Sequence, residues 1–176
     1  MRTYIALLRG INVGGKNKLP MKSLVALLEE LGCQQVRTYI QSGNAVFSHE
    51  TTNSTELANR ISAAIKESHG FEPRVLLLEK EALEKIIAQN PFPAAESEPK
   101  TLHVYFLESV PLQPDLEGLE SVKLDSERFA LKANAFYLHA PDGLGRSKLA
   151  AKAEKLIGVA ATARNWRTVS KLADML

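Results

Sequence analysis

A glycine-rich basic stretch near the N-terminus contains the residues best suited to hold an anion. It runs from Leu8 to Pro20 and has three glycines, two asparagines and three cations, with no acidic residue. Glycines let several backbone N–H groups approach one guest, and cations without a counter-charge attract negative charge. The candidate ligands in this stretch are Arg9, Asn12, Gly14, Gly15, Lys16 and Lys18. The pattern predicts an anion-binding loop and names no substrate.

Part of this stretch comes close to a P-loop but departs from it in two ways. Gly10–Asn17 reads G-x-x-x-x-G-K-N, so an asparagine replaces the Ser or Thr whose hydroxyl binds Mg²⁺ in a P-loop. The next helix is predicted to begin near Pro20, whereas a P-loop places its lysine at the helix entrance. The alternatives are a looser anion cradle and a simple flexible bend at Gly14-Gly15. We expect no cofactor.

The elements around this stretch predict an α+β fold whose first half has the order βαββαβ. Apolar and β-branched runs predict strands, and apolar residues at helical spacing predict the two helices between them. The expected strands are Tyr4–Leu8, Val36–Ile40, Ala45–Phe47 and Pro73–Leu78, and the expected helices cover residues 21–31 and 54–65. This is the order of the ferredoxin-like split βαβ fold.

The predicted fold brings a second polar segment to the basic stretch. In a split βαβ unit the first and second strands run parallel, with the third lying antiparallel between them. The loop after the first strand and the turn after the second therefore fall on the same edge of the sheet. That turn adds Gln41, Ser42 and Asn44 to the candidate ligands. The alternative is that these are ordinary turn residues.

The second half of the chain is predicted as a separate, smaller unit. Pro91–Pro99 is rich in proline and acid and is the expected linker, which gives subdomains 1–92 and 100–176. A strand over 101–107, a hairpin over 129–139 and helices over 148–157 and about 163–175 are expected. We predict a smaller mixed sheet followed by two C-terminal helices. No internal sequence repeat is recognisable.

Charge is distributed unevenly along the chain, although the net charge is only +2. Residues 1–28 contain five cations and no acid, residues 93–127 contain eight acids and two lysines, and residues 142–171 contain seven cations and two acids. The second basic segment supplies the candidate ligands Arg146, Ser147, Lys148, Arg164 and Asn165. We predict that the two basic segments meet in one cleft between the subdomains. The alternative is that both are solvated surfaces.

Several classes of function lack support in the sequence. The four histidines are far apart, and the one cysteine leaves no internal disulfide or cysteine-rich metal site. No apolar run is long enough to span a membrane, and the N-terminus lacks the pattern of a signal peptide, so a cytoplasmic location is expected. The aromatic motif of RNA-recognition modules is missing. We expect neither a metal nor a membrane partner.

Five ordered blocks of the sequence resemble the signature blocks of a largely bacterial, uncharacterised family. The blocks are Leu8–Gly15, Tyr39–Asn44, Asn90–Phe92, Arg146–Leu149 and Thr162–Trp166. The family is known as domain-of-unknown-function family 1697. The resemblance implies two α+β subdomains, the first of them ferredoxin-like, and it implies no activity. The blocks contain most of the polar residues already selected as candidate ligands.

Three functions remain open at this stage. The favoured one is a module that binds a phosphate-bearing ligand, either a nucleotide or a nucleic acid backbone. The second is a small enzyme that acts on an anionic metabolite, with Lys16 or Lys148 as electrophile or acid. The third is a protein-interaction module, in which the basic residues Arg164, Arg167 and Lys171 contact the acidic segment or a partner.

Overall fold

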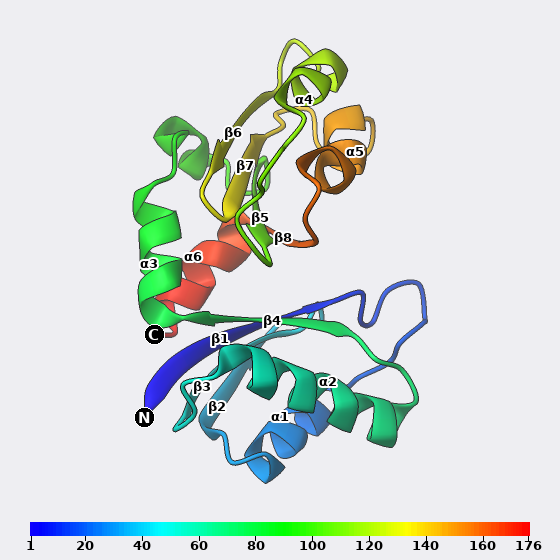
Figure 1. Ribbon diagram of the computed structural model, residues 1–176, viewed down its shortest axis with the longest axis vertical. Helices are drawn as coiled ribbons and strands as arrows, with labels where there is room; N and C mark the ends of the chain where they lie inside the picture. The colour runs from blue at the N-terminus through cyan, green and yellow to red at the C-terminus, as the bar shows by residue number, and fades with distance from the viewer. The chain divides into compact units, whose positions relative to one another are not determined.

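Two four-stranded antiparallel sheets, each with two helices packed on one face, account for most of the chain (Figure 1). The structure is a computed structural model that describes all residues from 1 to 176. The chain divides into two compact units. One consists of Met1–Lys85 together with Lys171–Leu176, and the other of Ile86–Ser170.

The first unit follows the predicted order of elements. They are β1 (Arg2–Arg9), α1 (Met21–Glu30), β2 (Gln34–Tyr39), β3 (Asn44–His49), α2 (Ser54–His69) and β4 (Arg74–Glu79). The strands lie in the order β2-β3-β1-β4, and every neighbouring pair is antiparallel. β1 is apolar on both faces: Tyr4–Leu8 is completely buried, and Tyr4, Ala6 and Leu8 face the helices. The helix α3 (Lys80–Ala88) follows β4 directly.

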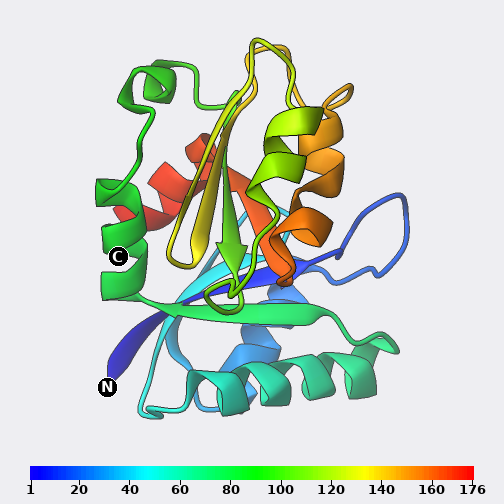
Figure 2. The ribbon, with the colours of Figure 1, turned by 45° about the horizontal axis from the view of Figure 1, so that its top comes forward.

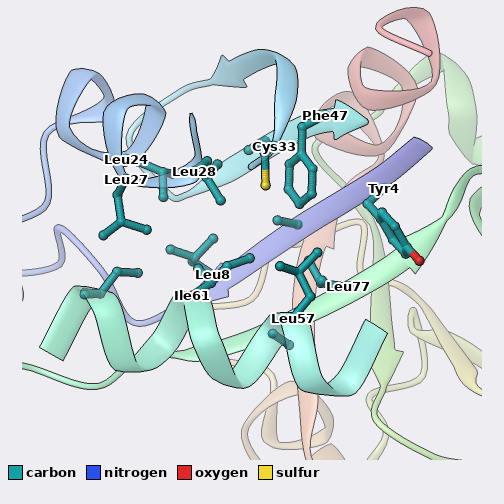
Figure 3. Close-up of a cluster of buried hydrophobic side chains, with 14 of the residues drawn as sticks. Tyr4, Leu8, Leu24, Leu27, Leu28, Cys33, Phe47, Leu57, Ile61 and Leu77 are labelled. Atoms are coloured by element: carbon teal, nitrogen blue, oxygen red, sulfur yellow. The ribbon is translucent and has the colours of Figure 1, made fainter. Parts of the chain in front are cut away.

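The core of the first unit lies between the sheet and its two helices (Figure 3). Side chains of α1 and α2 such as Leu28 and Ile61 pack against Tyr4, Leu8 and Phe47 of the central strands. Each large aliphatic or aromatic side chain buried in this way contributes about 1.5–3 kcal/mol. This packing determines which face of β1 points into the core, and it thereby determines where the chain leaves the sheet.

The second unit is built from the remaining strands and helices. They are η1 (Pro93–Ser97), β5 (Leu102–Leu107), α4 (Leu116–Val122), β6 (Arg128–Lys132), β7 (Ala135–His139), α5 (Lys148–Ile157) and β8 (Ala161–Asn165). They are followed by α6 (Trp166–Asp174), whose residues from Lys171 onward belong to the first unit. The strands lie in the order β6-β7-β5-β8, with antiparallel neighbours throughout. The prediction of a smaller, mixed second sheet is therefore wrong. The short helix α4 was not predicted, and residues 161–165 form a strand where the sequence predicted the start of a helix.

The two units share one plan that the sequence does not reveal. Each has the order β-α-β-β-α-β and the same order of strands in its sheet. At the end of the central strand, the N–H of Leu8 donates to the carbonyl of Gly43 at 2.8 Å, and the N–H of Leu107 donates to that of Asn134 at 2.9 Å. Because the two bonds join equivalent positions, the loop after β1 and the loop after β5 are structurally equivalent.

Candidate anion-binding site

The loop between β1 and α1 folds into a small hairpin that extends away from its sheet (Figure 2, blue). Val13 and Lys16 form an antiparallel bridge, and the N–H of Lys16 donates to the carbonyl of Val13 at 3.0 Å. Gly14 and Gly15 have φ of 58° and 74°. Two positive φ values in a row are the requirement of a type I′ hairpin turn, which few residues other than glycine and asparagine meet.

This hairpin is not a P-loop. The helix α1 begins at Met21, five residues after Lys16, so the lysine does not stand at the helix entrance. The N–H groups of Asn12 and Lys16 donate to carbonyls of the loop itself, at 3.0 Å in both cases. Part of the backbone is therefore already bonded internally, and lysine side chains are the more accessible groups for an anion.

Two asparagines brace the hairpin. Asn12 Oδ1 accepts the N–H of Leu19 at 2.8 Å, while its Nδ2 donates to the carbonyls of Leu19 and Gln41 at 2.9 and 2.8 Å. Asn17 Nδ2 donates to the carbonyl of Gly10 at 3.0 Å. An amide group has two N–H donors, and those of Asn12 are both used. The structure thus gives Asn12 and Asn17 the role of holding the loop in shape.

The turn between β2 and β3 lies beside the hairpin, as the sequence predicts. The bond from Asn12 to Gln41 joins the two segments directly, and the bond from Leu8 to Gly43 joins their bases. The contact at Gly43 is close, since a Cβ placed there would be 2.7 Å from Ile11 Cδ1. The loop and the turn therefore form one edge of the first sheet.

The polar residues of this turn differ in their exposure. Asn44 is completely buried, and its Nδ2 donates to the carbonyl of Tyr39 at 2.9 Å and to Ser42 Oγ at 3.0 Å. It supports the turn from inside. Gln41 and Ser42 are exposed next to the hairpin.

Exposed cations surround this edge. Arg9, Lys16 and Lys18 are all exposed, and neither lysine takes part in an ion pair of the structure. Arg9 lies directly opposite Arg74 in the pairing of β1 with β4. Residue type and spacing do not distinguish Arg74 as a candidate ligand. The predicted fold indicates its position beside Arg9, because the start of β4 must lie next to the end of β1 when the two strands are antiparallel.

The second group of candidate residues lies at one edge of the second sheet. His139 pairs with Leu102 and Asn165 pairs with His103, so β7 and β8 both end beside the start of β5. Arg146 and Ser147 lie between β7 and α5, Lys148 is the first residue of α5, and Arg164 and Asn165 lie at the end of β8. That this group and the hairpin serve one ligand stays a prediction.

Two residues of the second group cap helices. Ser147 is buried, and its Oγ accepts the N–H of Ala150 at 3.0 Å at the start of α5. Asn165 Oδ1 accepts the N–H of Thr168 at 3.1 Å at the start of α6. Arg146 and Lys148 are exposed. Burial lowers the pKa of the Arg164 guanidinium to about 10, which still leaves it protonated at neutral pH.

Metal-ligating side chains are not gathered in the structure. No cluster of three or more His, Cys, Asp or Glu side chains could hold a metal ion. The one thiol, Cys33, is buried, and burial raises its pKa to about 11, so it is not a thiolate nucleophile at neutral pH. No helix has the length and apolar character needed to cross a bilayer.

His103 is a buried imidazole whose Nε2 has no hydrogen-bond partner. Burial lowers its pKa, and a hydrogen bond with the Lys100 backbone opposes that effect in part. The neutral ring is therefore the form that the folded protein favours. In the unfolded chain the imidazole binds a proton at pH values near 6.5 and below.

We expect His103 to make the folded state less stable as the pH falls below about 6.5, because the unfolded chain then binds a proton that the folded chain does not. One proton accounts for a slope of up to about 1.4 kcal/mol per pH unit. Urea unfolding at a series of pH values between 5 and 8 measures the slope. His103→Gln should flatten it, whereas identical slopes in the two proteins would contradict this role.

Taken together, the architecture is that of an α+β protein with two βαββαβ units and a basic hairpin on the first. The chain belongs to the family described as protein of unknown function DUF1697, whose model matches residues 1–137. This confirms the family that the sequence blocks indicate, and the match includes the first three of those blocks. No curated protein matches the sequence.

A solved structure shares the fold over almost its whole length. It is that of a conserved bacterial protein from Streptococcus pneumoniae, which is 26% identical with a TM-score of 0.70. The alignment covers 99% of this chain and 98% of that one. The similarity supports the α+β architecture across both units, and it assigns no activity.

Proposed function

We propose that the first unit binds a phosphate-bearing anion at the edge formed by the β1–α1 hairpin and the β2–β3 turn. We also interpret the unit, with its strand order β2-β3-β1-β4, as a ferredoxin-like split βαβ fold. The sheet and its two helices form a rigid scaffold, and the hairpin that projects from it carries the binding residues.

The observation that carries the proposal is the left-handed and braced backbone of the hairpin. Five of its residues have positive φ, namely Gly10, Asn12, Gly14, Gly15 and Asn17. Ile11 and Leu19 anchor the base of the hairpin in the core, but core packing does not shape its tip, where Val13 is 65% exposed. Unusual backbone conformations that are held in place by their surroundings cluster at functional sites.

The charges of this edge suit a phosphate group. Lys16 and Lys18 extend from the braced hairpin, and an ammonium group is a common partner of phosphate oxygens. Gln41 and Ser42 add polar side chains from the neighbouring turn. The carboxylate of Glu72, which lies just before β4, forms an ion pair with Lys66 at 3.0 Å, and Lys66 therefore balances its negative charge. The edge is therefore a positively charged surface that attracts anions.

Binding is favoured over catalysis at this edge. The hairpin and the turn contain no Asp, Glu, His or Cys that could exchange a proton with a substrate next to Lys16 or Lys18. Two forms of the ligand share the same chemistry, a small phosphate compound and the backbone of a nucleic acid. They differ in how strongly salt weakens binding.

A thermal-shift screen of the full chain tests the proposal. The probes are inorganic phosphate, pyrophosphate, a nucleoside triphosphate and a short single-stranded DNA, with chloride at equal ionic strength as the control. A ligand that binds only the folded state raises the unfolding midpoint with its concentration. A shift that disappears steeply with salt identifies the nucleic acid form. If none of the four probes shifts the midpoint at millimolar concentration, the proposal is wrong.

A further inference from the structure

The second unit has its own projecting loop at the position equivalent to the basic hairpin. This loop, residues 108–115, joins β5 to α4 just as the hairpin joins β1 to α1. Each follows the central strand of its sheet, beyond the equivalent residues Leu8 and Leu107. Each also carries an exposed apolar side chain. Val13 of the hairpin is 65% exposed and Leu112 of the second loop is 95% exposed.

The loop in the second unit is firmly attached at both ends. The N–H of Glu108 donates to the carbonyl of Ala160 at 3.0 Å, and the N–H of Asp115 donates to that of Leu156 at 2.8 Å. Asp115 Oδ1 also accepts the N–H of Gly118 at 2.8 Å. Pro111 and Pro114 restrict the backbone between these ends. A loop held in this way loses little conformational entropy when a partner covers it.

The exposed apolar side chains of this loop belong to one short segment. Val110 in the loop and Leu116, the first residue of α4, are 57% and 52% exposed, on either side of Leu112. Single exposed apolar residues are ordinary, whereas several in one stiff segment are typical of a contact surface. In a small interface, Leu112 would be the anchor residue, and Val110 and Leu116 would surround it.

The charges next to the two projecting loops are opposite. Residues 108–120 contain four acids, Glu108, Asp115, Glu117 and Glu120, and no Lys or Arg, although Glu120 forms an ion pair with Lys123 at 3.7 Å. Residues 9–18 contain Arg9, Lys16 and Lys18 and no acid. One chain therefore carries an acidic loop with an apolar tip and a basic hairpin with an apolar tip. Opposite potentials of this kind steer surfaces together and favour one register of contact.

We propose that the chain associates head to tail with a second copy of itself, through the acidic loop of one copy and the basic hairpin of the other. Leu112 packs against Val13, and the acids that flank Leu112 lie close to Lys16 and Lys18. The contact is heterologous, because each copy uses a different surface. Two loops form a small interface, so the association is weak and depends on protein concentration and on salt.

Sedimentation velocity of the full chain tests this proposal from low micromolar to near-millimolar concentration, at low and at high ionic strength. The average mass should rise with concentration at low salt and fall back towards the monomer at high salt. Leu112→Ser and the double variant Lys16→Glu/Lys18→Glu should each weaken association by about tenfold or more, as loss of an anchor or of a charged rim does. All three native side chains are exposed, so the variants should keep the fold, which circular dichroism checks.

A mixture of the two variants gives the sharpest result. The Leu112→Ser chain keeps an intact hairpin, and the Lys16→Glu/Lys18→Glu chain keeps an intact acidic loop. Each alone should remain monomeric, while the mixture should form a heterodimer, since one complementary contact is restored. A wild-type chain that stays monomeric throughout, or a mixture that does not associate when the wild type does, would overturn the proposal.

The outcome is distinguishable from that of phosphate binding. If the chain binds a phosphate probe and stays monomeric, only self-association is wrong. If the chain associates and binds no phosphate probe, only the proposed function is wrong. Association that survives both sets of substitutions would mean that another surface is responsible and would also overturn the proposal.

Discussion

Replacing Gly43 by alanine should lower the free energy of unfolding by about 2–5 kcal/mol, the sum of about 1–3 for overpacking and about 1–2 for a left-handed backbone. The φ of Gly43 is 91°, a value that residues with a Cβ rarely adopt. The new Cβ would also lie 2.7 Å from Ile11 Cδ1 and 2.8 Å from Leu8 Cβ, both of them completely buried or nearly so. Denaturation in urea, followed by circular dichroism, measures the loss.

Gly10→Ala is the matched control for this effect. Gly10 also has a positive φ, at 73°, but nothing lies within 4 Å of the position of its Cβ. Its replacement should cost only the backbone term of about 1–2 kcal/mol. Equal losses in the two variants would show that Gly43 is not packed as tightly against Ile11 as the structure indicates.

Removal of both hairpin lysines should have the largest effect on ligand binding. Lys16→Ala/Lys18→Ala deletes two exposed cations, and we expect about 0.7 kcal/mol from each after solvent screening, which amounts to about tenfold in the dissociation constant. For a nucleic acid ligand the slope of log K against log salt should also decrease by about two. Isothermal titration with the probe that gives the largest thermal shift measures both quantities.

The control is a pair of lysines on a regular helix. Lys152 and Lys155 are exposed on α5 of the second unit, outside both groups of candidate ligands. Lys152→Ala/Lys155→Ala changes the net charge by the same amount as the hairpin variant. An equal loss of affinity in the two variants would mean that the anion responds to overall charge, and the hairpin would lose its assignment as a specific site.

Local signals made the first unit predictable. Pro20 stands immediately before the first residue of α1, Met21, and Gly32 follows its end with a φ of 90°. The apolar run of β1 and the turn after β2 are equally clear in the sequence. Once the order βαββαβ is known, the contact between the hairpin and the Gln41–Asn44 turn follows from strand direction alone.

The second unit was less predictable because long-range pairing decides its elements. The five residues of β8, Ala161–Asn165, lack a strong alternating pattern. Arg164 within the strand and Arg167 after it resemble a helical stripe of cations. Pairing with β5 holds this segment as a strand and delays the helix to Trp166. The common plan of the two units has no counterpart in the sequence, since it lies in backbone geometry and not in residue type.

The candidate site was predictable in place but only partly in detail. Residue types selected Asn12, Asn44, Ser147 and Asn165, and the structure shows the side chains of all four bonded to nearby backbone groups. Sequence alone does not distinguish a side chain that faces a ligand from one that supports a turn or a helix end. The exposed lysines of the hairpin are the residues on which the account now depends.

The most direct test of the account is a nuclear magnetic resonance titration of the full chain with the phosphate probe that binds best. We predict that the backbone amide shifts concentrate in the hairpin, residues 10–20, and in the neighbouring turn, residues 41–43, and that they are lost in Lys16→Ala/Lys18→Ala. Shifts that leave both segments unchanged while the probe binds elsewhere on the chain would contradict the central claim.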